Sequence, residues 1–207
     1  MKRTVLSIIM VTVVLTVSFA QEKRYDIERA ILKKNSVVVM GGMQQVISSV
    51  QYFDEYGNKE SSESVTNMAG QSLTMFSMVK DGYVYSANMT TKQGTKINMA
   101  AMMDDYKTVN YLNLTDEVKK KYQIEVRGNE KFFGKECNRY DLTVKIQGQS
   151  LKVSVWVWKG LSLKSSMSVA GSIITEEVTE IQEGAEIAKE KFALPEGINF
   201  IDMTPKQ

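Results

Sequence analysis

The sequence predicts a mainly β protein, a curved antiparallel sheet of about ten strands preceded by an export signal. Apolar and polar residues alternate with a period of two over most of the chain after residue 20, as in strands with one dry and one wet face. Short turn motifs such as Asp81-Gly82 separate these stretches, which indicates hairpins. A sheet of about ten strands has to curl to cover apolar residues on both of its faces.

The first twenty residues have the three parts of a secretory signal peptide. Lys2 and Arg3 form a positive start, residues 4–17 are almost uninterruptedly apolar, and a cleavage site is expected between Ala20 and Gln21. The apolar run is shorter than the roughly 20 residues that cross a bilayer, which argues against a retained anchor. No cysteine follows the run, so the new N-terminus cannot be lipidated. The sequence thus predicts a signal peptide over 1–20 and a single periplasmic or secreted domain over 21–207.

The mature chain is close to electrically neutral. Removal of Lys2 and Arg3 leaves 24 basic and 24 acidic residues, and the two signs are interleaved. A polyanion would meet no field of one sign, so nucleic acid is not expected as a partner. Cys137 is the single cysteine, so the fold is not a disulfide scaffold. We expect Cys137 to be a small core residue, with an intermolecular disulfide or a reactive thiol as the alternatives.

The strands of the first half are separated by predicted turns. Residues 54–58 connect a strand that ends at Phe53 to one that begins near Lys59. Asp81-Gly82 joins residues 72–80 to residues 83–91, and Gly94 is expected to close the next hairpin.

Two short helices are expected, one between the halves of the chain and one near its end. Thr115 can cap the first, with acidic residues at its positive end and Lys119, Lys120 and Lys121 at its negative end. The second is a helical turn over residues 188–192 that ends before Pro195.

The clearest strands lie in the second half of the chain. Over residues 139–147, Tyr140, Leu142, Val144 and Ile146 alternate with polar residues. The alternation continues over three further stretches, 151–158, 163–169 and 172–182, with turns at Gly148-Gln149 and Ala170-Gly171. Together these segments predict a four-stranded meander.

No catalytic constellation emerges from the residue types. Histidine is absent, so Ser-His and Cys-His nucleophile pairs and imidazole metal sites are missing. Ser77 and Lys80 match the S-x-x-K spacing of penicillin-binding serine enzymes. Those enzymes need both side chains on one helical face, whereas this stretch alternates as a strand. We therefore predict a protein that is not an enzyme, and we expect no cofactor.

Methionine is concentrated between residues 40 and 103. Three pairs have M-x-x-M spacing, Met40/Met43, Met75/Met78 and Met99/Met102, and thioethers are soft ligands that suit Cu(I). Positions i and i+3 of a strand face opposite ways, so Cu(I) binding is the weaker alternative and no metal site is predicted. Unbranched Met side chains also re-pack around apolar ligands of varied shape, which favours a flexible apolar lining.

Three stretches of the second half resemble a known family. They are residues 133–140 (FGKECNRY), residues 155–164 (VWVWKGLSLK) and, towards the end, residues 183–185 (EGA) with residues 192–197 (FALPEG), which contain the F-x-L-P motif of Phe192 to Pro195. They are similar to segments of a family of exported bacterial proteins of unknown function, itself similar to the lipoprotein-carrier superfamily of LolA, its lipoprotein relatives and the RseB sensor. The resemblance implies an unclosed, LolA-like half-barrel whose concave apolar face is plugged by short helices and accepts acyl chains. No motif around Arg127 or Arg139 matches the arginine with which the carrier handles lipoproteins.

The leading hypothesis is a non-enzymatic binding protein for a lipid, a lipoprotein acyl chain or another apolar small molecule. We expect the ligand in the concavity, in contact with a Met and aromatic lining formed by Met75, Tyr83, Tyr85, Met89, Met99, Trp156 and Trp158. The aromatic residues have an alternative role as core, because a buried Trp fills a large volume. The alternative hypothesis is an envelope protein-interaction or stress-sensing module that docks a partner segment.

The export signal gives the first testable prediction. The mature protein should begin at Gln21 and appear in the periplasmic fraction without a lipid adduct, because the apolar run is followed by a cleavage site and no cysteine. N-terminal sequencing and intact mass measurement of the major species check this. A major species that retains Lys2 and Arg3 would contradict it.

Overall fold

The computed structural model of the protein describes residues 23–68, 71–98, 109–146, 149–169 and 171–204. The signal peptide, with its predicted cleavage between Ala20 and Gln21, lies outside these residues, as do Met99 and Met102. The strands are β1 (Ala30–Met40), β2 (Met43–Asp54), β3 (Lys59–Met68), β4 (Gln71–Lys80), β5 (Tyr83–Asn88), β6 (Gln93–Asn98), β7 (Glu125–Phe132), β8 (Lys135–Ile146), β9 (Gln149–Trp158), β10 (Leu161–Val169), β11 (Ser172–Glu183) and β12 (Asn199–Asp202). The helices are α3 (Asp116–Lys121) and the two 3-10 turns η2 (Glu55–Gly57) and η3 (Lys189–Phe192).

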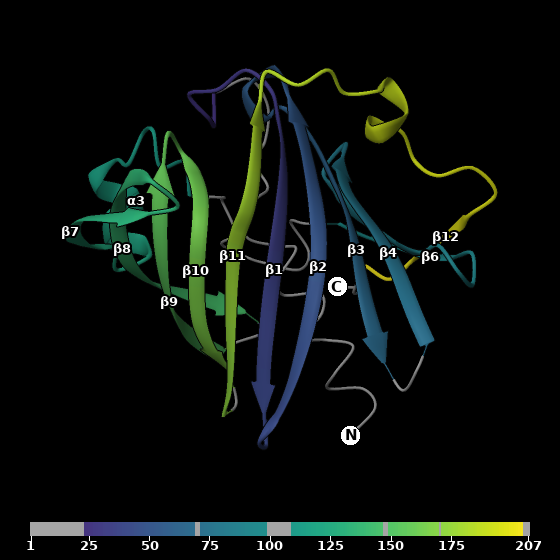
Figure 1. The fold of residues 1–207 in the computed structure, drawn as a ribbon, viewed down its shortest axis with the longest axis horizontal. Helices are drawn as coiled ribbons and strands as arrows, with labels where there is room; N and C mark the ends of the chain where they lie inside the picture. The colour runs from purple at the N-terminus through teal and green to yellow at the C-terminus, as the bar shows by residue number, and fades with distance from the viewer. Residues whose placement is uncertain (1–22, 69–70, 99–108, 147–148, 170, 205–207) are drawn as a thin grey trace.

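All twelve described strands belong to one sheet, in the order β12-β6-β5-β4-β3-β2-β1-β11-β10-β9-β8-β7. Every pair is antiparallel except β12 with β6, which is parallel. Figure 1 shows that the sheet is strongly curved and that its end strands, β7 and β12, lie on opposite sides of the molecule. The prediction of a mainly β, unclosed half-barrel of LolA-like form is confirmed.

The predicted four-stranded meander is β8 to β11, which are consecutive in the sheet. Tyr140, Leu142 and Val144 stand opposite Val155, Val153 and Leu151 and share one face, as the alternation predicted. The meander joins the N-terminal half of the chain through β1, which pairs with β11 on one side and with β2 on the other.

The described residues contain two strands more than the roughly ten that the sequence indicated. Residues of β7 alternate poorly, because nearly all of them are exposed on both faces at the sheet edge. Strand β12 has only four residues and pairs with β6 after a long return of the chain. A period-two pattern detects neither kind of strand, since each lacks an extended row of buried side chains.

The expectation that Gly94 closes a hairpin was wrong. Strand β5 ends at Asn88, whose side-chain oxygen accepts hydrogen bonds from the backbone N–H groups of Thr90 and Thr91, and this local pattern makes the turn. Gly94 instead lies within β6. A Cβ at Gly94 would stand 2.7 Å from atoms of Ile198 and of Phe200, so glycine allows the C-terminal segment to pack against β6.

Both predicted helical segments are present. The Thr115 hydroxyl accepts a hydrogen bond from the backbone N–H of Val118, with a separation of 3.3 Å, and so caps α3 as expected. The second is the 3-10 turn η3, which ends three residues before Pro195. Lys191 of η3 pairs with Glu63 at 2.7 Å and lies over the Tyr52 ring, which fixes this turn against β2 and β3.

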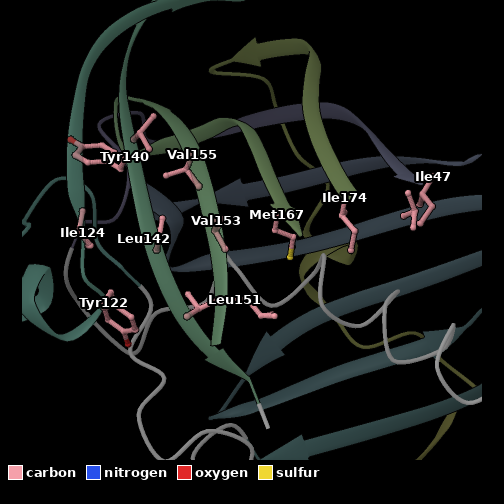
Figure 2. Packing of buried hydrophobic residues seen from close by; sticks show 13 residues of the cluster. Ile47, Tyr122, Ile124, Tyr140, Leu142, Leu151, Val153, Val155, Met167 and Ile174 are labelled. Atoms are coloured by element: carbon pink, nitrogen blue, oxygen red, sulfur yellow. The ribbon is translucent and has the colours of Figure 1, made fainter. Parts of the chain in front are cut away.

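The largest core cluster lies on one face of the sheet, which we call the inner face. It extends from β8 and β9 across β10 and β11 to β1 and β2, which contribute Val38 and Ile47. Figure 2 shows Val153, Met167 and Ile174 from three different strands within this cluster. Tyr111, Leu114 and Val118, from the segment that contains α3, pack against it. The inner face is thus partly covered by a helical segment, as the resemblance implied.

The opposite side, which we call the outer face, is covered at one place by the C-terminal segment. Phe76, Met78 and Ala87 are buried there, with Leu194, Ile198 and Phe200 packed against them. The Phe200 ring meets the Tyr85 ring edge-on, with centroids 5.2 Å apart.

Cys137 is fully buried and free. It packs in a separate cluster with Phe132, Trp156 and Trp158 among its neighbours. Burial raises the pKa of its thiol. Cys137 is thus a small core residue, the first of the roles expected for it.

The Gly94 contact gives a stability prediction. Gly94→Ala should destabilise the protein by roughly 1–3 kcal/mol, because the added methyl group overlaps Ile198 and Phe200. In a Phe200→Ala background, which makes room, the same substitution should cost less than half as much. Urea unfolding of the four proteins of this double-mutant cycle measures the difference. Equal costs in both backgrounds would show that the C-terminal segment does not depend on Gly94.

Candidate functional site

The concave inner face is the candidate site, and the structure divides the seven expected lining residues among different surfaces. Met75 is on the inner face, where it stands opposite Ser64 of β3 and Asn88 of β5. Tyr83 and Tyr85 are on the outer face, where Lys96 lies over the Tyr83 ring and Phe200 meets Tyr85. Met89 packs against the same outer cluster, and Met99 lies outside the described residues.

Trp156 and Trp158 also lie on the outer face, opposite in direction to Val155 and Val157. The Trp156 indole N–H donates to a Glu130 carboxylate oxygen at 2.7 Å, and Arg139 and Lys164 lie over its ring at 4.9 and 5.2 Å. The hydrogen bond from Trp156, together with that from Arg139, lowers the pKa of Glu130.

Trp158 is covered in the same way, by the ammonium groups of Lys135 and Lys159, which also pair with Glu183. Cations over the ring faces stabilise half-exposed indoles, and both rings also pack against the core cluster that contains Cys137.

The inner face carries a large apolar cluster and a polar band, and beside the band Val79, Val84 and Ile97 form a short apolar row on β4 to β6. The apolar cluster lies on β8 to β11 and continues as far as Ile47 of β2. The band consists of hydroxyl and amide side chains on β2 to β6. Its first row follows cross-strand pairs and contains Gln51, Ser62, Ser77, Ser86 and Thr95. Its second row contains Ser49, Ser64, Met75, Asn88 and Gln93.

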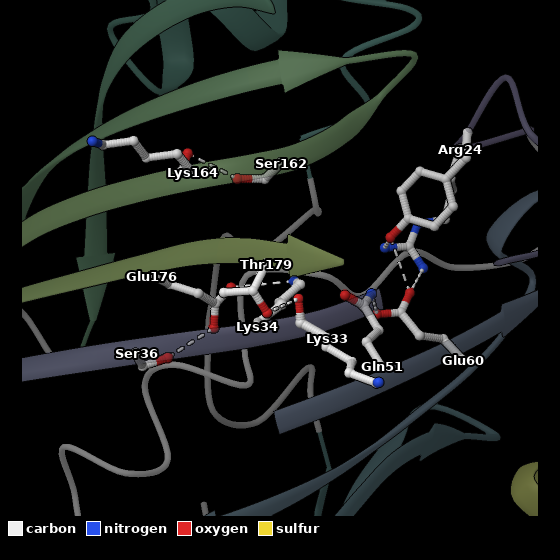
Figure 3. A network of polar contacts seen from close by, with 11 residues as sticks. Arg24, Lys33, Lys34, Ser36, Gln51, Glu60, Ser162, Lys164, Glu176 and Thr179 are labelled. Carbon is white, nitrogen blue, oxygen red and sulfur yellow. Dashed lines mark hydrogen bonds and ion pairs between the residues drawn. The ribbon is translucent and has the colours of Figure 1, made fainter. Parts of the chain in front are cut away.

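A polar network lies between the apolar cluster and the band, on the central strands (Figure 3). Lys34 is 6% exposed and pairs with Glu176 at 3.2 Å, and the Ser36 hydroxyl donates to the other Glu176 oxygen.

Further along the same face, Glu60 accepts hydrogen bonds from Arg24 at 2.8 Å, from the Tyr25 hydroxyl at 3.1 Å and from the Gln51 amide. Burial is the largest influence on Tyr25 and raises the pKa of its phenol above the ordinary value. Burial lowers the pKa of Arg24, but Tyr25 and Glu60 outweigh that effect and the pKa is raised. Lys34 and Arg24 are thus both held by carboxylates.

The band and the network were missed at the sequence level. The signal was present in β1, where Lys34 and Ser36 occupy the same alternating positions as Leu32 and Val38. It was also present in β3, where Ser62, Ser64 and Thr66 alternate in the same way. Serine and threonine occur on the solvent-facing side of strands as well as on an inner face. The alternation alone therefore did not show that these residues lie on the inner face.

The catalytic and metal alternatives can be placed on the same surfaces. Ser77 points to the inner face and Lys80 to the outer face, so their side chains do not form a nucleophile pair. Met75 and Met78 are likewise on opposite faces, whereas Met40 and Met43 stand directly opposite each other across a two-residue turn. Among the described residues, no group of three or more His, Cys, Asp or Glu side chains is placed to hold a metal ion.

Comparison with solved structures identifies the fold. An uncharacterized conserved protein from Thermus thermophilus aligns over 84% of this chain and 90% of its own, with 8% identity and a TM-score of 0.51. A putative outer membrane lipoprotein-sorting protein domain from Vibrio parahaemolyticus aligns over 82% of this chain and 91% of its own, with 10% identity and a TM-score of 0.45. A chain of the Pseudomonas aeruginosa MucA/MucB complex aligns over 82% of this chain and 57% of its own, with 13% identity and a TM-score of 0.46.

The likeness to the Thermus protein concerns the fold alone. No protein-family model matches the chain, and no curated protein matches it in sequence. No helix in the described part of the chain is both long and apolar enough to span a membrane.

The buried ion pair gives a second stability prediction. Glu176→Gln leaves the buried Lys34 ammonium without its carboxylate, so we expect the free energy of unfolding to fall by about 3 kcal/mol. The double variant Lys34→Met, Glu176→Gln should recover most of this loss, because it buries no unpaired charge. The matched control is Glu180→Gln, whose pair with Lys33 is 2.7 Å long but exposed, and its cost should stay below about 1 kcal/mol. Urea unfolding that gives equal costs for the two single variants would contradict the prediction.

Proposed function

We propose that the protein is an exported, non-enzymatic binding protein that holds a lipid, a lipoprotein acyl chain or another apolar ligand on the inner face of its half-barrel. The observation that carries the proposal is the continuous apolar cluster, which extends across six strands of one concave face. The ligand would make further apolar contacts with this face of the sheet. The face is open on one side because the end strands β7 and β12 do not pair with each other.

Energetics support an acyl chain as the occupant. Transfer of one CH₂ group from water to an apolar site is worth about 0.8 kcal/mol, so a sixteen-carbon chain gains roughly 12 kcal/mol. A carrier has to offer a comparable surface to compete with a membrane for the chain. The valine, isoleucine, leucine and methionine side chains of β8 to β11 are buried in this cluster, and a chain would extend the cluster at Val169 and Val109, which are only partly buried.

Met75 is the expected lining residue through which the proposal is best tested. It is half-buried on the inner face, and its thioether can adapt to ligand shape. Tyr83, Tyr85, Met89, Trp156 and Trp158 face the other way, so a ligand on the inner face would contact Met75 and not these five side chains.

A second candidate function is docking of an envelope protein, and a patch on the outer face favours it. Ile173, Val39, Val46 and Val65 are 53%, 38%, 47% and 40% exposed and come from four adjacent strands, β11, β1, β2 and β3. Exposed apolar patches of adjacent residues are typical of protein interaction sites. Lipid that co-purifies with the mature protein would favour the first function, since a docking module should be isolated empty.

Acyl binding is the direct test. The mature protein should bind a fluorescent fatty acid with micromolar or tighter affinity, and Met75→Lys should weaken binding at least about tenfold, because a charge would lie beside the chain. The control is Val46→Lys, which places the same charge on the outer face and should leave affinity unchanged. Met75→Leu, with similar volume, should retain binding if the fold is intact.

Two results would overturn the proposal. One is failure of acyl probes to bind folded protein at any reachable concentration, and the other is equal behaviour of Met75→Lys and Val46→Lys. Native mass spectrometry of mature protein taken directly from its own periplasm would then show whether a protein partner accompanies it.

A further inference from the structure

The hydroxyl band on β2 to β6 contains hydroxyl and amide groups to which an acyl chain in contact with Met75 supplies no hydrogen-bond partners. Its first row runs through Gln51, Ser62, Ser77, Ser86 and Thr95, each directly opposite the next on an adjacent strand. Directly opposite side chains in a sheet have Cβ atoms about 5 Å apart. The row therefore presents polar groups at regular intervals across five strands.

One hydroxyl of this row is buried and has no partner within the described part of the protein. Ser77 is 6% exposed, and its Oγ makes no hydrogen bond there. The neighbouring hydroxyls of Ser62 and Ser86 stand on either side of it and are only half-buried. A buried hydroxyl without a partner costs free energy, so a ligand that supplies one is favoured.

The band is electrically neutral. Its two rows contain hydroxyl and amide side chains and Met75, and no charged residue. The outer face of the same strands carries Glu63, Lys80 and Lys96.

The cations nearest to the band on the inner face, Lys34 and Arg24, are already held by Glu176 and Glu60. A phosphate would therefore find no unpaired cation among the described residues of the band. A neutral headgroup with many hydroxyls would instead find matched donors and acceptors.

The band also begins where the apolar cluster ends. Ile47 belongs to the cluster, and Ser49, two residues further along β2 on the same face, belongs to the band. A molecule that spans this boundary would meet apolar side chains at one end and hydroxyls at the other.

We propose that the inner face takes an amphipathic lipid with a neutral, sugar-like headgroup, whose acyl part lies on the apolar cluster and whose hydroxyls bond to the row around Ser77. This inference rests on the proposed function, because it names the class of lipid that the same concave face holds. It adds a polar subsite on β3 to β5 that sets the preference among lipids of equal chain length.

Competition among ligands with one chain and different headgroups tests the inference. Decyl maltoside, decanol and decyl phosphate, each below its micelle concentration, compete with a bound fluorescent fatty acid. Decyl maltoside should compete at a concentration about tenfold lower than decanol or decyl phosphate, as expected for one or two additional neutral hydrogen bonds.

The variant Ser77→Ala, Ser86→Ala should abolish this preference for maltoside and leave competition by decanol unchanged. Its matched control is Ser166→Ala, Ser168→Ala on the outer face of β10, which should keep the preference. Urea unfolding of both double variants verifies that the fold is retained.

The outcomes separate the two proposals. Equal competition by the three ligands, a preference for decyl phosphate, or a preference that survives in Ser77→Ala, Ser86→Ala would overturn the inference and leave acyl binding intact. Failure of every decyl ligand and of the fatty acid to bind would overturn the proposed function, and the inference with it.

Discussion

The pairing of β1 with β11 is the constraint on which the rest of the structure depends. It joins residues 30–39 to residues 173–183, so two meanders that are remote in sequence become one sheet. Without it, the apolar cluster of β8 to β11 would end at β11 and would not reach Ile47. Contacts over such a sequence separation require closure of a long loop before they stabilise anything, which slows folding. The register shift at Lys33/Lys34 within this pairing also brings Lys34 opposite Val178 and leaves it beside Glu176.

The predictable part of the fold was set by local patterns. Long alternating strands, the Asp81-Gly82 hairpin and the cap at Thr115 all depend on neighbours in sequence, and all three are present. Strand order and the parallel pairing of β12 with β6 depend on contacts between distant segments, and the alternation does not encode them. Gly94 illustrates the difference. Its role is set by Ile198 and Phe200, about a hundred residues away, and it was therefore misread as a turn residue.

The candidate site was predictable only in part, for a related reason. Alternation shows that Trp156 and Val155 face opposite ways, but it does not say which direction is concave. The large aromatic residues suggested a binding surface, whereas the structure places them under Lys135, Arg139, Lys159 and Lys164 on the outer face. Met75 lies on the inner face, and its contact with a ligand is a proposal. The hydroxyl band was missed because no single Ser or Thr is informative, and only the cross-strand register makes a row of them.

The C-terminal segment has a consequence for how the molecule avoids self-association. Strand β12 occupies the free edge of β6 with four residues, and the chain before it covers Phe76, Met78 and Ala87. An uncovered sheet edge beside exposed apolar side chains is a template on which other chains add strands. Strand β12 and the segment before it thus protect this edge of the sheet. Proteolytic cleavage near η3 would expose the edge of β6, and other chains would then add strands to it.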